Sequence, residues 1–202
     1  MRSSAEPPIA VTGSRLAAAL LRAAGWTLRF DGLPAKQGVI VVYPHTSNWD
    51  FPVGLLAKWA MGVPVHFWGK ASLFRVPLFG RWMRSLGGIP VDRSAPQGVV
   101  EAMVQRFVAA RERGEFHWLV LSPEGTRSYR DHWRSGFYRV ALGARVPVGI
   151  ATLDWGRRTI DLRRFVELSG DPVADLALIA GHLQGVRGRR PELAAPVTLA
   201  SP

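Results

Sequence analysis

Two residues that could exchange protons lie close together in residues 43–50 (YPHTSNWD), directly after the apolar run GVIVV. A histidine with a pKa near roughly 6.5 can take and return a proton at neutral pH, and a carboxylate on its second nitrogen fixes its tautomer. His45 and Asp50 could supply both groups. Five positions of a regular helix would place them roughly 140° apart, so they meet only if the chain turns. The TSN between them favours a turn, although the pattern also fits a loop histidine before an ordinary first-turn acid.

A second polar segment, SPEGTRS at residues 122–128, follows the apolar run WLVL. Gly125 would let backbone N–H groups approach an anion, Thr126 could donate its hydroxyl group, and Arg127 could pair two N–H groups with a phosphate. In a parallel sheet, such a strand exit is where a site usually lies. The alternative is a surface turn with a solvated arginine, because Pro-Glu-Gly is a common turn signal.

A third segment, residues 69–93, is basic and aromatic. It has five Lys or Arg residues against one Asp, interleaved with Phe74, Phe79 and Trp82. This mixture suits a site that holds a phosphate beside an acyl chain. It equally suits single-stranded nucleic acid, whose bases stack on aromatic rings over a basic groove.

The elements that position these segments alternate between strands and helices. Short β-rich runs bounded by turn residues predict strands at residues 38–43, 63–68, 118–123 and 145–151, with a weaker alternating run at 159–165. Apolar spacing and cap residues predict helices at 14–24, 98–114 and 171–183. This order indicates a single α/β domain with a mixed, mostly parallel sheet flanked by helices. The helix at 14–24 could lie on a membrane or cover the core.

Length and composition fit one globular domain. The chain has 202 residues, 48% of them hydrophobic, and no repeat or internal linker. We expect a flexible N-terminus at residues 1–12, the domain at 13–186, and a basic, flexible tail at 187–202. The absence of cysteine excludes disulfides, thiolate zinc sites and a cysteine nucleophile.

The formal charge of +11 favours an anionic partner, such as nucleic acid, anionic lipid or a phosphorylated substrate. The N-terminal residues lack the apolar core of a signal peptide. The longest apolar stretch, residues 51–69, is interrupted by Lys58 and two prolines and is not expected to span a membrane. These features predict a cytoplasmic protein.

Several other chemistries lack their motifs. Neither G-x-S-x-G, G-x-x-x-x-G-K-[ST] nor H-E-x-x-H occurs. The remaining histidines, His66, His117, His132 and His182, have no spacing typical of metal ligands and are predicted to be packing or surface residues. We therefore expect no metal site.

The order HTSNWD, GK, GGIPVDR, SPEGTRS and VPVGIA resembles the four sequence blocks of the glycerolipid acyltransferases, the family of lysophosphatidic acid (1-acylglycerol-3-phosphate) acyltransferases. The resemblance spans roughly residues 39–151. It implies a glycerol-3-phosphate acyltransferase-like fold, with His45 as general base and Asp50 as its orienting partner. It further implies that the acceptor and its phosphate are bound by Lys70, Arg93, Glu124, Gly125, Thr126 and Arg127. The chain departs from the family at Ser122, where the block usually begins with Phe.

The resemblance also implies the reaction and its partners. A fatty acyl group would pass from acyl-CoA or acyl carrier protein, as co-substrate and without a cofactor, to a lysophospholipid acceptor. The enzyme would work on the anionic inner face of the cell membrane as a peripheral protein. One alternative is the same chemistry on another lipid or glycolipid hydroxyl. A different class, a basic nucleic-acid-binding module, has the charge in its favour but no RRM, KH or zinc-finger signature, so no nucleic acid partner is expected.

Overall fold

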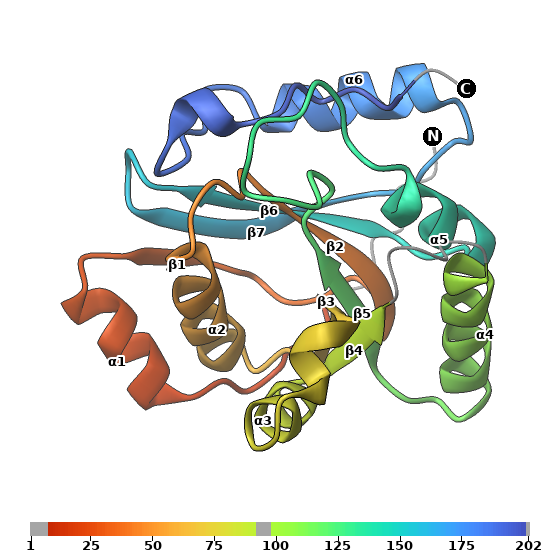
Figure 1. Ribbon diagram of the computed structural model, residues 1–202, viewed down its shortest axis with the longest axis horizontal. Coiled ribbons are helices and arrows are strands. Elements are labelled where there is room, and N and C mark those ends of the chain that lie inside the picture. The colour runs from red at the N-terminus through yellow and green to blue at the C-terminus, as the bar shows by residue number, and fades with distance from the viewer. Residues whose placement is uncertain (1–7, 92–97, 201–202) are drawn as a thin grey trace.

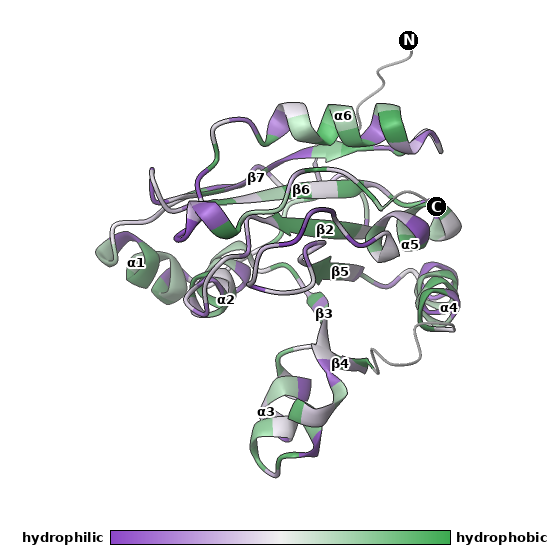
Figure 2. Ribbon diagram, turned by 45° about the horizontal axis from the view of Figure 1, so that its top comes forward, coloured by the Kyte–Doolittle hydropathy of each residue, from purple (hydrophilic) through white to green (hydrophobic). Residues whose placement is uncertain are grey.

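The apolar run before His45 forms strand β2 (Gln37–Tyr43) at the centre of a seven-stranded sheet (Figure 1). The computed structural model describes residues 8–91 and 98–200. The first five residues of β2 are buried, as is typical of a parallel strand that is covered on both faces. Figure 2 shows the same feature, because β2 and its neighbour β5 (His117–Leu121) are strongly hydrophobic.

The sheet has the strand order β1-β7-β6-β2-β5-β3-β4, and every neighbouring pair is parallel except β6 and β7. The expected mixed, mostly parallel sheet is thereby confirmed. The sequence does not predict β1 and β4, because such short runs show no alternating pattern. The other strands are β1 (Thr27–Arg29), β3 (Val65–Lys70), β4 (Gly88–Val91), β6 (Val148–Asp154) and β7 (Thr159–Val166).

Helices cover both faces of the sheet (Figure 1). On one face α4 (Val99–Glu112), α5 (Gly136–Ala144) and α6 (Pro172–His182) pack against Val39 and Val41 of β2. On the other face α1 (Arg15–Ala23) and α2 (Asp50–Met61) contribute to a second cluster with residues of β6 and β7. The predicted helices correspond to α1, α4 and α6. The remaining helical elements are α3 (Phe79–Ser85) and the 3₁₀ turns η1 (Ala71–Arg75) and η2 (Pro191–Leu193).

The polar segments that the sequence analysis selected start at one edge of the sheet. Because β2, β5 and β3 are parallel neighbours, their carboxyl ends lie along the same edge. His45 follows β2, the segment at 122–128 follows β5, and Lys70 is the last residue of β3. The topology therefore brings together residues that are far apart in the sequence, at the edge where α/β sheets usually bind their ligands.

Residues 187–200, which we call the C-terminal segment, do not form the flexible tail that their basic composition predicts. The carbonyl of Arg187 accepts a 2.8 Å hydrogen bond from the Trp155 N–H, and the carbonyl of Thr198 accepts one of 2.6 Å from the Trp133 N–H. Ala195 is buried in the core, and Val197 and Leu199 pack against it. The prediction was wrong because a basic composition does not prevent a few apolar residues and backbone hydrogen bonds from holding a segment on the core.

The domain also begins before residue 13. Ile9 and Leu33 exchange two backbone hydrogen bonds of 2.7 and 3.1 Å, while residues 1–7 lie outside the described part of the chain. The apolar stretch at 51–69 forms most of α2 and β3, as expected for a segment of a globular fold. Across residues 8–91 and 98–200, no helix has both the length and the apolar character needed to cross a membrane.

Candidate active site

The structure brings His45 and Asp50 together. His45 Nδ1 lies 3.2 Å from Asp50 Oδ2, and the histidine side chain is 20% exposed whereas the carboxylate is buried. The chain turns between them, because the Ser47 N–H donates a 2.8 Å hydrogen bond to Asp50 Oδ2 and the Asp50 N–H donates one to the Ser47 carbonyl. Asp50 is the first residue of α2. The turn that the spacing required is therefore present, and the catalytic roles of the pair stay a prediction.

The Asp50 carboxylate is held ionised by its hydrogen bonds. Burial raises the pKa of Asp50, but hydrogen bonds from His45, the Ser47 N–H and Trp155 outweigh it, and the pKa lies below its ordinary value. Trp155 Nε1 donates a 2.8 Å hydrogen bond to Asp50 Oδ1. Sequence reasoning missed Trp155, which follows β6 and is 105 positions away from Asp50. Its local sequence, DWGRR, looks like a surface turn.

Glu124 braces the loop that carries His45 from a buried position. Its side chain is fully buried, and its two carboxylate oxygens accept hydrogen bonds from the His45 N–H at 2.6 Å and the Ala195 N–H at 3.0 Å. Burial raises the pKa of Glu124, against the lowering effect of these hydrogen bonds. Glu124 thus links the loop that carries His45 to the C-terminal segment. The expected role of Glu124 in binding the acceptor stays a prediction.

The three residues that follow Glu124 have different environments. Gly125 has φ of +66°, and a Cβ atom there would lie 2.6 Å from Arg134 Nε, so the position favours glycine. Its N–H donates a hydrogen bond to the Ser122 carbonyl at 3.1 Å, and the expected approach of backbone N–H groups to an anion stays a prediction. Thr126 and the exposed Arg127 line the cleft described below, and the Thr126 hydroxyl accepts a 3.2 Å hydrogen bond from the Ser128 N–H.

Of the two phosphate-binding residues expected from the other blocks, the structure describes one. Lys70 is exposed at the end of β3 and lines the same cleft as His45. Arg93 lies outside the described residues. Of the remaining histidines, His66 and His117 stack within the sheet at 4.7 Å between ring centroids, and His182 is exposed at the end of α6, as predicted. His132 lines the cleft beside Asp131.

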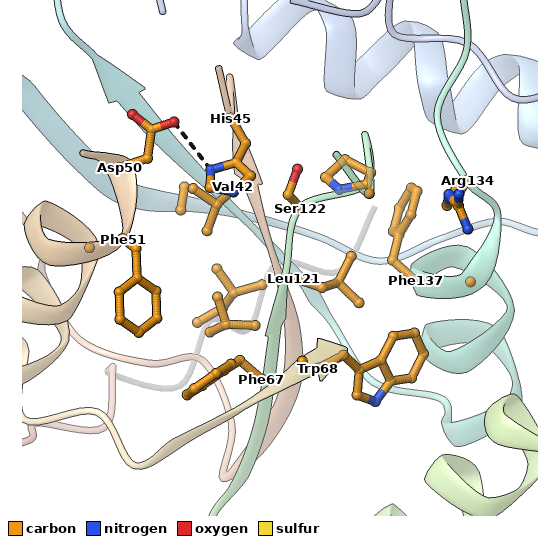
Figure 3. A pocket seen from close by; sticks show the side chains of 18 of the residues that line it. Val42, His45, Asp50, Phe51, Phe67, Trp68, Leu121, Ser122, Arg134 and Phe137 are labelled. Atoms are coloured by element: carbon orange, nitrogen blue, oxygen red, sulfur yellow. Dashed lines mark ion pairs between the residues drawn. The ribbon is translucent and has the colours of Figure 1, made fainter. Parts of the chain in front are cut away.

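His45 opens onto a cleft of about 880 Å³, near the upper end of the roughly 300–1,000 Å³ typical of small-molecule sites. Figure 3 shows His45 and Ser122 at the ends of two strands, with a mainly apolar lining around them. The Ser122 hydroxyl is buried and has no hydrogen-bond partner within the described residues. Such a cleft suits a ligand with a long apolar part. Apolar side chains that line it are Val42, Phe51, Phe67, Trp68, Leu121 and Phe137.

Comparisons with known proteins find relatives by sequence and by fold. A family model described as Acyltransferase matches residues 27–150, more than half of the chain. A 1-acyl-sn-glycerol-3-phosphate acyltransferase from Streptococcus pneumoniae (strain ATCC BAA-255 / R6) is 29% identical over 119 residues. That match covers 58% of this chain and 42% of the relative, so the chain corresponds to less than half of the relative's length.

A solved structure has a similar fold. The crystal structure of the 1-acyl-sn-glycerophosphate (LPA) acyltransferase PlsC from Thermotoga maritima superimposes with a TM-score of 0.53 at 18% sequence identity. The match covers 86% of this chain and 78% of that one. At this identity the likeness concerns the fold alone.

Proposed function

Because this chain belongs to the acyltransferase family, we propose that it transfers a fatty acyl group from a thioester, acyl-CoA or acyl carrier protein, to a hydroxyl of a lysophospholipid such as 1-acylglycerol-3-phosphate. The resemblance drawn from the sequence blocks is confirmed by the family match. The observation that carries the proposal is the His45–Asp50 pair at the opening of a large apolar cleft. The name of the Streptococcus pneumoniae relative supports the choice of acceptor.

The geometry defines how His45 would act. A proton on Nδ1 that is donated to Asp50 leaves the Nε2 lone pair ready to accept a proton. Within the described residues Nε2 has no hydrogen-bond partner. Nε2 takes the proton of the acceptor hydroxyl as its oxygen attacks the thioester carbonyl, which forms a tetrahedral oxyanion. The oxyanion collapses to the ester and a thiolate, and the imidazolium returns the proton to the thiolate. Asp50 stabilises the imidazolium meanwhile.

Replacement of His45 tests this proposal. In His45→Ala the rate of transfer should fall by about 10² to 10⁴, the usual contribution of a general base, while the fold survives. Asp50→Asn should have a milder effect, because it keeps the shape but no longer supports an imidazolium. His182→Ala, a change of an exposed histidine away from the cleft, is the matched control and should leave the rate unchanged.

The assay follows thiol release from acyl-CoA with and without 1-acylglycerol-3-phosphate, with the acylated product identified by mass spectrometry. Monoacylglycerol and a glycolipid in place of the acceptor distinguish the proposed substrate from other lipid hydroxyls. A folded His45→Ala protein that turns over as fast as the His182→Ala control would contradict the assigned role.

We also propose that the protein works at the surface of an anionic membrane, because its proposed substrates are amphiphiles. In α1, Ala17 and Leu21 are buried, so this helix covers the core with one face, whereas Leu16 and Leu20 remain exposed. A second exposed apolar group lies on η1 and α3. Both groups of side chains are available for contact with lipid.

A further inference from the structure

A small polar hollow lies beside the cleft. It measures about 230 Å³ and is lined by residues 46–49, Arg127, Arg189 and Arg190, and we call it the arginine hollow. Arg127 lines both the hollow and the cleft, and Thr46 directly follows His45, so the hollow lies near the candidate base. The volume of the arginine hollow lies below the roughly 300 Å³ at which drug-sized ligand sites begin, so the hollow suits a small chemical group.

The three arginines of the hollow are exposed and carry uncompensated charge. No acidic residue of the part of the chain that the structure describes lines the hollow. Among the described residues, none of the ion pairs involves Arg127, Arg189 or Arg190. Three arginines that line one small cavity bring several positive charges near one another, and an anion between them would offset their repulsion. The hollow therefore has the electrostatic character of an anion site.

The protein holds this part of the C-terminal segment in place. The Arg189 guanidinium lies over the ring of Trp155 at 4.8 Å and that of Trp49 at 5.8 Å. The Arg190 N–H donates a 3.2 Å hydrogen bond to the Thr46 hydroxyl. Gly188 permits this close approach, because a Cβ atom there would lie 2.6 Å from Thr46 Oγ1. The arginines are thus positioned by the loop that carries His45.

We propose that Arg189 and Arg190, which the C-terminal segment adds beside Arg127, bind a phosphate group of a substrate in the arginine hollow. A guanidinium group matches two phosphate oxygens with two parallel N–H groups, and such charged hydrogen bonds are stronger than neutral ones. An amphiphile with its phosphate in the hollow and its chain in the apolar cleft would extend past His45. Arg189 and Arg190 lie outside the matched residues 27–150, so this part of the site goes beyond the family blocks.

The inference rests on the proposed acyl transfer only for the identity of the substrate. The phosphate could belong to the acceptor or to the coenzyme A of the donor, because both present the same chemistry to arginine. The two sources are separated by the kinetic experiment below, whereas binding itself is measured without turnover.

Calorimetric titration tests binding directly. Inorganic phosphate and glycerol 3-phosphate are titrated into the full chain, with glycerol as the uncharged probe. The dissociation constants of both phosphates should rise at least tenfold in Arg189→Gln/Arg190→Gln. The matched control is Arg29→Gln/Arg164→Gln, which removes two exposed charges that line neither cavity, and its affinities should not change. Equal affinities in both double variants, with unchanged melting temperatures, would overturn the inference.

Kinetics identify the substrate. Two donors, acyl-CoA and acyl pantetheine without phosphate, are combined with two acceptors, 1-acylglycerol-3-phosphate and monoacylglycerol. If the acceptor phosphate occupies the hollow, Arg189→Gln/Arg190→Gln should raise the KM for 1-acylglycerol-3-phosphate about tenfold to a hundredfold with either donor. If the donor phosphate does, the KM for acyl-CoA should rise and that for acyl pantetheine should not.

The failure of each proposal has its own signature. If the double variant shows the KM values of the wild-type chain for all four substrates, the inference fails and the acyl transfer stands. If the wild-type chain transfers no acyl group in any combination, the proposed function fails, and the calorimetric comparison still decides whether the hollow binds phosphate.

Discussion

Asp50 is fixed more strongly than a single histidine contact would require. Its Oδ1 accepts from Trp155, and its Oδ2 accepts from the Ser47 N–H and faces His45 Nδ1. The Trp155 ring in turn packs edge-on against Trp26 at 4.9 Å and lies under the Arg189 guanidinium. Trp155 therefore connects Asp50 with the arginine hollow. Its contribution to stability can be measured through its hydrogen bond to the Asp50 carboxylate.

Trp155→Phe keeps most of the ring but removes the donor to Asp50. The buried oxygen loses its partner, so the free energy of unfolding at neutral pH should fall by about 1–3 kcal/mol. In the wild-type protein the pKa of Asp50 is lower when folded than when unfolded. The stability it contributes is therefore present above the unfolded value and lost as the pH falls through the folded one. The difference between the proteins should shrink below about pH 4.

Denaturant unfolding between pH 7 and pH 2 measures this difference. Trp59→Phe, a change in an exposed tryptophan on α2, is the control and should be close to wild type at every pH. A Trp155→Phe protein whose loss of stability is the same at pH 7 and pH 2 would show that the hydrogen bond to Asp50 does not cause it.

At the scale of elements, the C-terminal segment completes the site. Glu124 holds the Ala195 N–H with one oxygen and the His45 N–H with the other, and the Tyr43 hydroxyl donates a 3.0 Å hydrogen bond to the Ala195 carbonyl. The segment is therefore attached to the end of β2 and to the loop after it. This attachment keeps Arg189 and Arg190 beside His45.

Glu124→Gln should loosen the segment. A glutamine offers one acceptor oxygen to two N–H donors, and its amide group would face one of them, so the stability should fall by about 1–3 kcal/mol. Trypsin should then cut more quickly after Arg187 and Arg189, whereas Pro191 protects the bond after Arg190. Glu167→Gln, at an exposed site, is the matched control. Equal cleavage rates and melting temperatures in the two variants would refute the bracing role of Glu124.

On the scale of the molecule, η1 and α3 extend away from the body of the sheet (Figure 2). These two elements and the turn between them carry exposed apolar side chains beside the exposed Arg75 and Arg81. Arg84 differs from these two, because it donates to the Phe74 carbonyl and lies over the Phe74 ring. The exposed apolar residues are Leu73, Val76, Leu78, Phe79 and Trp82.

Arg75→Glu/Arg81→Glu should weaken binding to vesicles that contain anionic lipid. Each basic residue near such a surface contributes on the order of 1 kcal/mol, so the reversal of two charges should reduce the bound fraction strongly at low salt. Binding of the wild-type chain should also fall as salt is added. Co-sedimentation measures both effects, with Arg29→Glu/Arg164→Glu as the control. A wild-type chain that does not co-sediment with anionic vesicles at low salt would contradict the proposed membrane docking.

Much of the fold could be predicted from the sequence, because its main signals are local. The apolar runs of β2, β5 and β6 and the periodic spacing of α4 are each contained in fewer than twenty residues. Once these strands are taken as parallel, their carboxyl ends share one edge, which already places His45 near the segment at 122–128. The turn between His45 and Asp50 followed in the same way from the geometry of a short peptide.

The remaining features depend on packing between distant segments. Glu124 and Ala195 are 71 positions apart, and Trp155 and Asp50 are 105 apart. No short pattern marks Glu124 as a brace, Trp155 as a donor or Arg189 as part of a cavity, since each residue would look like a turn or surface residue in its own segment. Their roles arise because a buried carboxylate must find hydrogen-bond donors, and the folded chain alone determines which donors are within reach.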